Sequence, residues 1–565
     1  MAVDALCHAL AKAGYPADYT RDLYQGFTLG FDLGIGQSQS GTYPTPGSCQ
    51  NPPPLSSESW ARVHKHLLDE VAVGRRLGPF PGRPEGLFWT GARVSPLSEI
   101  PKGEDSGKFR LIFNLSYGGS CSVNSSIPEE LGSVVYPSFE DVVQKINAVG
   151  VGRVWFGLHD VVDAFRHLPI RQDQWKYLVS SWPSANGKQD FFVDTCLCFG
   201  VRTGPSIYHK FGAAVEFLLV KLAGCEVIRM TDDHMFLAIS AHLLEMMLGR
   251  AERLFGFLRI PWSLPKRVGA TRACKFLGYW WDAEADLVSL HPSRVTKMLV
   301  KLEALMIQPW VCAHDVRKLV GLLVWASKVL PYGRIMNLPL HRALARAGAT
   351  SVRASMARTI YFQLDSDAMD SVIWWITLCH RHQSSPRTVG RKISTFFLPP
   401  PTPLVTAHCD ASGVALGGWV GRDWFQVKVP DHITVGAGVN TSGPPAGQVV
   451  YSSTLAEAAG ALATVLIFGD AAANSHMLIK SDSNDLVEAW RTGSTRAPGL
   501  ARYLAAIALA CSHRGIVLTL EHIMGVENGI ADAISRSLMQ RFRALHPMAA
   551  LLPLREPSAD QIWLW

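Results

Sequence analysis

The sequence feature that most constrains the fold is a pair of adjacent carboxylates, Asp232 and Asp233, which lies between two short apolar runs. Val227 and Ile228 precede the pair, and the apolar residues 235–239 follow it. Short apolar runs that are separated by a polar turn predict a β-hairpin, here with the acids at its tip. Asp is common in turns for local hydrogen-bonding reasons, so the pair alone also fits a solvated turn. Carboxylate oxygens are, however, the ligands that Mg²⁺ prefers.

A third carboxylate, Asp160, follows the apolar segment 154–158 and precedes Asp232 by 72 residues (232 − 160). That length leaves room for a helical crossover and another strand. Asp163 comes after the expected end of the strand, where it would face solvent or cap a turn. Phe165 fits either a core position or a place beside a nucleotide sugar, where its ring would exclude a 2′-hydroxyl.

Basic side chains gather in and just after the turn-rich segment 96–108, which leads into an alternating strand over 109–115. They are Lys102, Lys108 and Arg110. A triphosphate site needs such cations, and an Arg side chain offers two parallel donors. An ordinary exposed hairpin explains the same residues.

A second set of acids lies beyond the Pro-rich stretch 398–404, which marks a domain boundary. The set spans 123 residues (532 − 410 + 1) and consists of Asp410, Glu457, Asp482 and Asp532. Asp410 and Asp482 lie at the ends of predicted strands. Glu457 lies in the first turn of a predicted helix, and Asp532 lies in the last helical segment. Each acid alone fits a surface position, but their order along alternating strands and helices favours a shared site.

Five blocks, in order, resemble the fingers and palm of a reverse transcriptase. The palm resemblance rests on D-V-V-D-A-F (160–165) followed by strand, acid pair and strand. The other blocks are K-F-R-L-I-F-N-L-S (108–116), the Gly-containing turn and helix (197–211), L-F-G-F-L-R-I-P-W-S-L-P-K (254–266) and the primer-grip-like K-F-L-G-Y (275–279). Two departures are Met230, where the family has an aromatic residue, and Phe199, where many relatives have Gln. Both put fidelity, processivity and efficiency in doubt.

The resemblance implies an RNA-directed DNA polymerase, a nucleotidyltransferase that uses two Mg²⁺ (or Mn²⁺) ions per active site. Asp160, Asp232 and Asp233 would be its catalytic metal ligands, with Asp232 the surer of the adjacent pair. The residues implied to bind substrate are Lys102, Lys108, Arg110, Phe165, Gly200 and Lys266, of which Lys266 matches a lysine near the pyrophosphate leaving group.

The region after residue 404 resembles ribonuclease H, in its order of strands and helices and in its four acids. Asp410, Glu457, Asp482 and Asp532 match the metal-binding carboxylates of that endonuclease, and His522 and Asn528 match its last loop. His522 would assist proton transfer or product release. The implied reaction is hydrolysis of RNA within an RNA–DNA hybrid, again with two metal ions.

We therefore expect an α+β multidomain protein, with a right-hand polymerase (fingers, palm, thumb) followed by a ribonuclease H-like α/β domain. The expected segments are a flexible N-terminal arm (1–58), fingers and palm (59–284), a helical thumb and connection (285–397), the ribonuclease H-like domain (398–540) and a C-terminal tail (541–565). Implied partners are an RNA template, a DNA primer, RNA–DNA hybrid, dNTPs and other retroelement proteins.

Composition agrees with a polyanionic partner without requiring one, because the net charge is +7 and the pI about 8.8. The N-terminal residues lack a secretory signal pattern and no run of 18 apolar residues occurs, so we expect an intracellular protein without a membrane span. Segments 68–80 and 481–493 and the absence of an integrase-like segment resemble DIRS-type retrotransposons most, with Gypsy-like elements as runner-up. Two alternatives remain open: a decayed or domesticated copy that binds hybrid without copying it, and an enzyme that retains only ribonuclease H activity.

Overall fold

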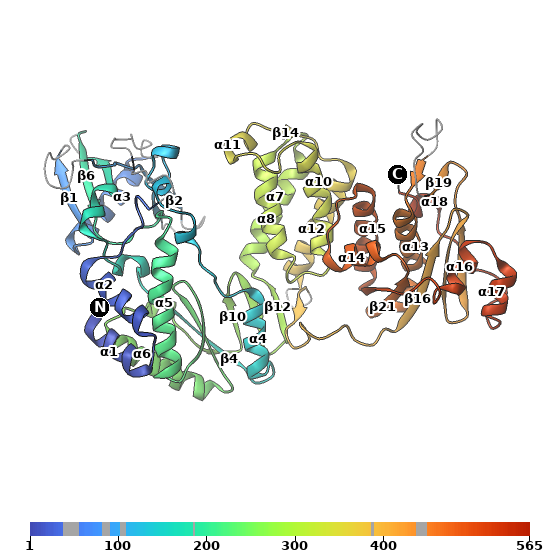
Figure 1. Ribbon diagram of the computed structural model, residues 1–565, viewed down its shortest axis with the longest axis horizontal. Coiled ribbons are helices and arrows are strands. Elements are labelled where there is room, and N and C mark those ends of the chain that lie inside the picture. The colour runs from blue at the N-terminus through green and yellow to red at the C-terminus, as the bar shows by residue number, and fades with distance from the viewer. Residues whose placement is uncertain are drawn as a thin grey trace. The chain divides into compact units, whose positions relative to one another are not determined.

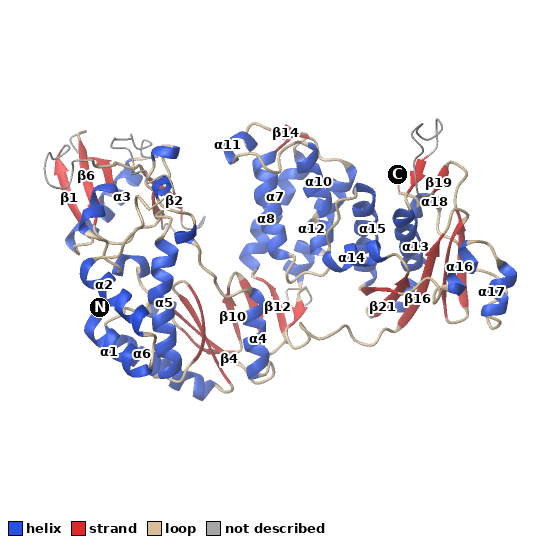
Figure 2. Ribbon diagram, viewed as in Figure 1, coloured by secondary structure: helices blue, strands red, loops and turns tan. Residues whose placement is uncertain are grey.

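The computed structural model describes residues 1–37, 44, 56–81, 91–101, 109–184, 187–385, 389–436 and 449–564 (Figure 1). They form two compact units, Met1–Leu277 and Gly278–Trp565. Both units mix helices with strands, as Figure 2 shows, which confirms the α+β expectation. The two units are described separately below.

A four-stranded antiparallel sheet in the order β7-β8-β4-β9 forms the centre of the first unit. Its strands are β4 (Trp155–Asp160), β7 (Glu226–Met230), β8 (Asp233–Ala238) and β9 (Val268–Thr271). β7 and β8 form the predicted hairpin, and the acid pair lies at its tip. The hairpin prediction is therefore confirmed.

Helix α6 (Ala241–Leu258) packs on this sheet, against β4, β8 and β9. Its buried residues recur at the three- and four-residue spacing of one helix face: Leu244, Met247, Leu248, Ala251, Phe255 and Leu258. Gly157 of β4 allows the close approach, because a Cβ there would lie 3.0 Å from Leu248. Two further helices of the unit are α5 (Gly204–Lys221), which contacts β7, and α4 (Phe139–Val149), which contacts β8.

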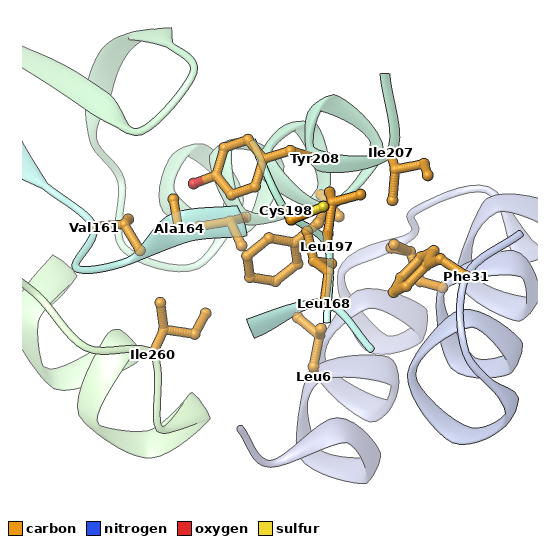
Figure 3. Packing of buried hydrophobic residues seen from close by; sticks show 14 of the residues in the cluster. Leu6, Phe31, Val161, Ala164, Leu168, Leu197, Cys198, Ile207, Tyr208 and Ile260 are labelled. Atoms are coloured by element: carbon orange, nitrogen blue, oxygen red, sulfur yellow. The ribbon is translucent and has the colours of Figure 1, made fainter. Parts of the chain in front are cut away.

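The expectation of a flexible arm over residues 1–58 is wrong for residues 1–37, which are folded. They form α1 (Val3–Ala13) and α2 (Ala17–Leu29), which pack against each other, and α1 also contacts α5 and α6. Leu6 and Phe31 lie in the core beside Leu168 and Leu197, as Figure 3 shows. The physical reason is an apolar face at helical spacing that gains free energy by burial, whereas the Gly- and Pro-rich pattern belongs only to the residues that follow. Residues 38–43 and 45–55 of the expected arm lie outside the described residues.

Two smaller sheets and another helix also lie in the first unit. One sheet has the order β1-β6-β5, with β1 (Arg76–Pro81), β5 (Val179–Pro183) and β6 (Gln189–Asp194). The other pairs β2 (Leu97–Pro101) with β3 (Phe109–Phe113), which confirms the strand predicted from residue 109. Helix α3 (Ser57–Ala72) begins at a serine cap, Ser56, whose side chain accepts from Ser59.

The second unit begins with strands and continues with helices. β11 (Tyr279–Asp282) pairs with β12 (Leu287–Leu290), which pairs with β15 (Arg391–Lys392). The helices of the segment are α7 (Pro292–Ile307), α8 (Ala313–Ala326), α9 (Gly333–Met336), α10 (Leu338–Arg346), α11 (Ala354–Ala357) and α12 (Ser366–Ser384). The helical character predicted for 285–397 is confirmed.

The rest of the second unit is built on a five-stranded sheet in the order β18-β17-β16-β21-β22. β16 (Val405–Ala411), β17 (Ala415–Val420) and β18 (Asp423–Lys428) are antiparallel to one another. β21 (His476–Ser481) and β22 (Val517–His522) continue the sheet from β16 in parallel. The helices of this part are α13 (Ser453–Phe468), α14 (Asn484–Thr492), α15 (Pro498–Arg514), α16 (Gly529–Ser535), α17 (Met539–Leu545) and α18 (Ala559–Ile562). In addition, the short strands β19 (Ile433–Val435) and β20 (Val449–Tyr451) pair with each other.

Among the described residues, one helical stretch, Ser453–Ala472, is long and apolar enough to cross a membrane. Its most apolar window is 72% buried inside the protein. The stretch contains α13, which packs against β16, β17 and α15, and such burial fits a core helix.

The units are divided differently from the expected domains. The division falls at 277/278 rather than at 284/285, and the helical segment and the sheet that follows it form one unit. Contacts between these two parts explain why: Tyr332 donates to the carbonyl of Ile516, and Arg502 pairs with Asp367 at 3.0 Å.

The expected C-terminal tail is also folded, because Trp563 is 2% exposed and Tyr503 donates to the carbonyl of Ile562 at 3.0 Å. Tail residues thus belong to the core of the second unit, which local sequence pattern did not indicate.

Candidate active sites

The first cluster of acids lies where β4 meets the β7–β8 hairpin. Asp160 is the last residue of β4 and lies directly opposite Asp233, the first residue of β8. Asp232 occupies the turn, and its carbonyl accepts from the Val161 amide at 3.2 Å. Antiparallel pairing therefore brings the adjacent acids Asp232 and Asp233 to Asp160, which precedes Asp232 by 72 residues in sequence (232 − 160).

The charges of this cluster are poorly balanced. Withdrawal from water raises the pKa of Asp232, and the charge of Asp160 adds to the effect. Although Asp233 as a residue is exposed, partial burial of its carboxyl group and the charges of Asp232 and Asp160 raise its pKa to about 7. Crowded carboxylates with raised pKa values are stabilised by a cation, and hard oxygen ligands fit Mg²⁺ or Mn²⁺.

Lys266 is the cation that the structure places at this cluster. It lies in the single turn Leu264–Lys266, and its ammonium donates to the carboxylate of Asp160. Partial burial lowers the pKa of Lys266, but the hydrogen bond and the charge of Asp160 raise it overall. The sequence-based assignment of Lys266 to this site is thus supported by contact with a predicted metal ligand.

Phe165 lies in a small aromatic cluster near the same strand. Its ring meets Phe199 edge-on at 4.9 Å and Tyr208 at 5.2 Å between ring centroids. Phe199, the residue that departs from the family pattern, is 57% exposed. Asp163 has a positive φ of 49° and pairs with Arg75 at 2.9 Å, in agreement with its expected place in a turn.

Gly200 occupies a position that requires glycine. Its φ is +110°, and a Cβ there would lie 2.2 Å from the carbonyl oxygen of Phe113, at the end of β3. Asn124 holds the same turn by donating to the Gly200 carbonyl at 2.8 Å. Arg110 lies exposed on β3, and Lys102 and Lys108 lie outside the described residues.

Sequence reasoning missed two residues that support the acid hairpin. Arg229 of β7 is 2% exposed and donates to the carbonyl of Thr231 at 3.0 Å. His234 of β8 is 1% exposed and contacts the carbonyl of Asp232 at 3.0 Å through Nδ1. The available signal was their polarity within otherwise apolar strands.

The second cluster of acids lies at the carboxyl ends of the parallel strands β16 and β21. His408 pairs with Lys480, so the register extended by two residues places Asp410 opposite Asp482. Glu457 reaches the same place from α13, which packs on β16. One ligand oxygen from each of Asp410, Glu457 and Asp482 lies within 4.8 Å of the others, a spacing that could hold a metal ion.

Hydrogen bonds hold two of these carboxylates in place. The Ala411 amide donates to Glu457 at 3.1 Å, and the Ser535 hydroxyl donates to Asp410. Burial, followed by the charges of Asp410 and Asp482, raises the pKa of Glu457 well above its usual range. Burial also raises the pKa of Asp410 to about 6, against the hydrogen bond from Ser535. As in the first unit, the concentrated negative charge fits a divalent cation.

The fourth predicted acid, Asp532, is not in that compact set. It lies on α16, where it pairs with Arg536 at 2.5 Å and with Arg541 at 3.5 Å. His522 is the exposed last residue of β22 and lies opposite Ser481, next to Asp482. Asn528 is buried and donates to the carbonyl of Cys409 at 2.8 Å, which ties the last loop to the strand of Asp410.

No protein-family model matches the chain, and no curated protein matches it. Solved structures similar to it include foamy viral protease-reverse transcriptases, each 13% identical. A "dRH" form with double-stranded DNA has a TM-score of 0.45 and covers 92% of this chain and 82% of that one. The protease-reverse transcriptase with double-stranded DNA has a TM-score of 0.43, with 92% and 97% covered. The same protein with RNA/DNA hybrid has a TM-score of 0.38, with 94% and 85% covered. Similarity at this level does not support a conclusion about function. Any such conclusion rests instead on the residues of the two acid clusters.

Proposed function

We propose that this chain is a retroelement RNA-directed DNA polymerase with a fused ribonuclease H. The observation that supports the proposal best is that each unit contains its own cluster of crowded, strand-end carboxylates. Two such clusters suit a protein that makes and breaks phosphodiester bonds, because two-metal sites clamp the attacking and leaving oxygens of an in-line displacement. Segments 68–80 and 481–493 favour a DIRS-like element over a Gypsy-like one.

In the polymerase site, Asp160, Asp232 and Asp233 would hold two Mg²⁺ or Mn²⁺ ions. The bound ions would supply charge stabilisation for the attack of a primer 3′-hydroxyl on the α-phosphate of a dNTP. Lys266 would then lie near the pyrophosphate that leaves. Arg110, with Lys102 and Lys108, would contact the triphosphate, and Gly200 would shape the turn beside the incoming nucleotide.

In the nuclease site, Asp410, Glu457, Asp482 and Asp532 would hold two ions for the attack of water on the RNA strand. His522 would move a proton or assist release of the product. An RNA–DNA hybrid is recognised through its shape and its 2′-hydroxyl groups, so cleavage would depend little on base sequence. An RNA template, a DNA primer and other retroelement proteins would be partners inside the cell.

The test is Mg²⁺-dependent extension of a DNA primer on an RNA template, together with cleavage of a labelled RNA–DNA hybrid. Asp232→Asn should abolish extension and leave cleavage intact, whereas Asp410→Asn should abolish cleavage and leave extension intact. These reciprocal effects would establish two separate sites. Extension that survives Asp232→Asn would contradict the proposal for the first unit.

One observation favours a second candidate, an enzyme that cleaves hybrid and uses its polymerase-like unit only to bind it. Among the described residues, the compact set of ligand oxygens lies in the second unit, whereas Asp160 of the first unit is held by Lys266. Cleavage without any extension by the wild-type protein would select this candidate. Hybrid binding without either reaction would indicate a decayed or domesticated copy.

A further inference from the structure

The turn of the acid hairpin is strained. Thr231 has a φ of +57°, in the left-handed region that β-branched residues avoid. It directly precedes Asp232, so its backbone sets the direction in which that carboxylate leaves the hairpin. Strained residues of this kind persist only where surrounding contacts hold them, and they cluster at functional sites.

Three donors hold the two carbonyls of this turn. Arg229 donates from Nη1 to the Thr231 oxygen at 3.0 Å, and the Val161 amide donates to the Asp232 oxygen at 3.2 Å. His234 contacts the same Asp232 oxygen at 3.0 Å through Nδ1. A carbonyl oxygen can only accept, so Nδ1 of His234 carries the hydrogen.

Arg229 is itself anchored on helix α5. Its Nε pairs with Glu216 at 3.3 Å, and its Nη2 contacts Nδ1 of His209 at 3.4 Å. The guanidinium lies so close to Gly212 that a Cβ there would be 2.5 Å from Nη1. The glycine therefore leaves the space through which a charged side chain of β7 reaches from the helix to the turn.

We propose that Arg229 and His234 are positioning residues that hold Thr231 in its strained conformation and so direct Asp232 toward the metal site. The proposal rests on the proposed polymerase function, but it concerns residues that touch neither metal nor substrate. It also offers a physical substitute for the aromatic residue that Met230 replaces, since the buried guanidinium of Arg229 holds the turn through a charge-assisted hydrogen bond.

Gly212→Ala is the sharpest test, because it displaces the guanidinium without changing any residue of the hairpin. Alanine is the better helix former, so helix propensity alone would stabilise α5. Gly256→Ala in α6 is the matched control, since a Cβ there meets no atom within 4 Å. Arg229→Met is the second variant, which removes the donors and keeps most of the side-chain volume.

The first measurement is hydrogen exchange of a peptide that covers residues 226–238, made on the full-length protein without nucleic acid. Faster exchange in Gly212→Ala and Arg229→Met, but not in Gly256→Ala, is the expected result. Unchanged exchange in both variants would overturn the proposal. This arm does not depend on polymerase activity, so it still decides the matter if the wild-type protein extends no primer.

The second measurement is primer extension as a function of Mg²⁺. We expect kcat to fall by about 10- to 100-fold in both variants, because a misplacement of 1 Å can cost on the order of 100-fold. The Mg²⁺ concentration for half-maximal activity should rise, while KM for the dNTP changes little. Adding Thr231→Gly to Gly212→Ala should restore most of the loss, since glycine adopts a positive φ without strain. Lost kcat with unchanged Mg²⁺ dependence and no rescue would overturn the proposal.

Discussion

Lys266 donates a hydrogen bond from its ammonium to the carboxylate of Asp160, the acid that ends β4. This ion pair occupies a lone pair that a bound metal ion would otherwise use. A metal ion that bound to the same carboxylate oxygen would displace the lysine, which would then be free to meet a leaving group.

Replacing Lys266 should accordingly change two quantities in opposite directions. Lys266→Met should lower the Mg²⁺ concentration for half-maximal extension, because Asp160 is no longer occupied by a cation. The same variant should lower kcat by about 100-fold, the lower end of the loss expected when a positioned donor to a developing negative charge is removed. Single-nucleotide incorporation across a Mg²⁺ series measures both quantities. Lys266→Arg keeps the charge as a control, and a fall in kcat with weaker Mg²⁺ binding would contradict this account.

The aromatic contact between Phe165 and Phe199 yields a prediction of how the proposed polymerase site would select the sugar of its nucleotide. Phe165→Ala should lower the preference for dNTPs over rNTPs by about 10- to 100-fold, since it opens the space that a 2′-hydroxyl needs. Phe199→Ala should act in the same direction but less strongly, because it only releases the Phe165 ring. Competition between labelled dNTP and rNTP on one primer measures the ratio. An unchanged ratio in Phe165→Ala would remove this residue from the sugar site.

Gly200 offers a separate test of local geometry. Gly200→Ala should lower the free energy of unfolding by about 2–4 kcal/mol, because it adds a steric clash to the strain of a positive φ. Gly14→Ala is a matched control, since Gly14 has a φ of +81° but no atom within 4 Å of an added Cβ. The control should lose about 1–2 kcal/mol, the cost of a left-handed conformation for a residue with a Cβ. Denaturant unfolding of the three proteins gives the comparison, and equal losses would argue against the contact with Phe113.

The proposed nuclease site predicts a stability change that depends on pH. The pKa of Asp410 is raised from 3.8 to about 6, so the metal-free folded protein binds this proton more tightly than the unfolded chain does. Stability is therefore lost as the pH rises from about 4 to 6, and the loss is complete above that window. Asp410→Asn lacks this loss and should be more stable by about 1–3 kcal/mol at pH 8, with little difference near pH 4.

Thermal unfolding in the presence of a chelator measures this effect. Added Mg²⁺ should stabilise the wild-type protein and have less effect on Asp410→Asn, because the ion compensates the buried charge that the variant lacks. A variant less stable than wild type at pH 8 would show that the Ser535 hydrogen bond outweighs the burial of Asp410.

The parts of both sites that sequence pattern predicts are those whose geometry is local. The β7–β8 hairpin follows from apolar runs around Asp232 and Asp233, and the strand-end position of Asp410 follows from alternation. Lys266 was assigned to the polymerase-like site through a family resemblance rather than through spacing, and its contact with Asp160 was not predicted. Features of this kind can be predicted from neighbouring residues in the sequence, or from a known order of sequence blocks in a family.

The parts that sequence pattern did not predict depend on tertiary packing. The Gly- and Pro-rich sequence that follows a short opening helix candidate led to the expectation of an arm over residues 1–58, although Leu6 and Leu10 have the spacing of a buried helix face. The sequence gives no indication of the role of Arg229, because that role depends on Gly212 of a different element. The tail residue Trp563 is buried, and its ring lies 5.4 Å from that of Tyr451 in β20, a contact that no local pattern encodes.

Asp532 provides the last prediction, because its two arginine partners compete with any metal ion. Both arginine side chains are more than half exposed, at 58% for Arg536 and 56% for Arg541, so the pairs should contribute at most about 1 kcal/mol to stability. Arg536→Gln should therefore leave unfolding nearly unchanged but raise hybrid cleavage at limiting Mg²⁺ by a few fold, because Asp532 becomes available as the fourth ligand. Arg491→Gln, which removes another exposed helix pair with Glu488, serves as the control. Reduced cleavage in Arg536→Gln alone would instead assign this arginine to contact with the phosphate backbone of the hybrid.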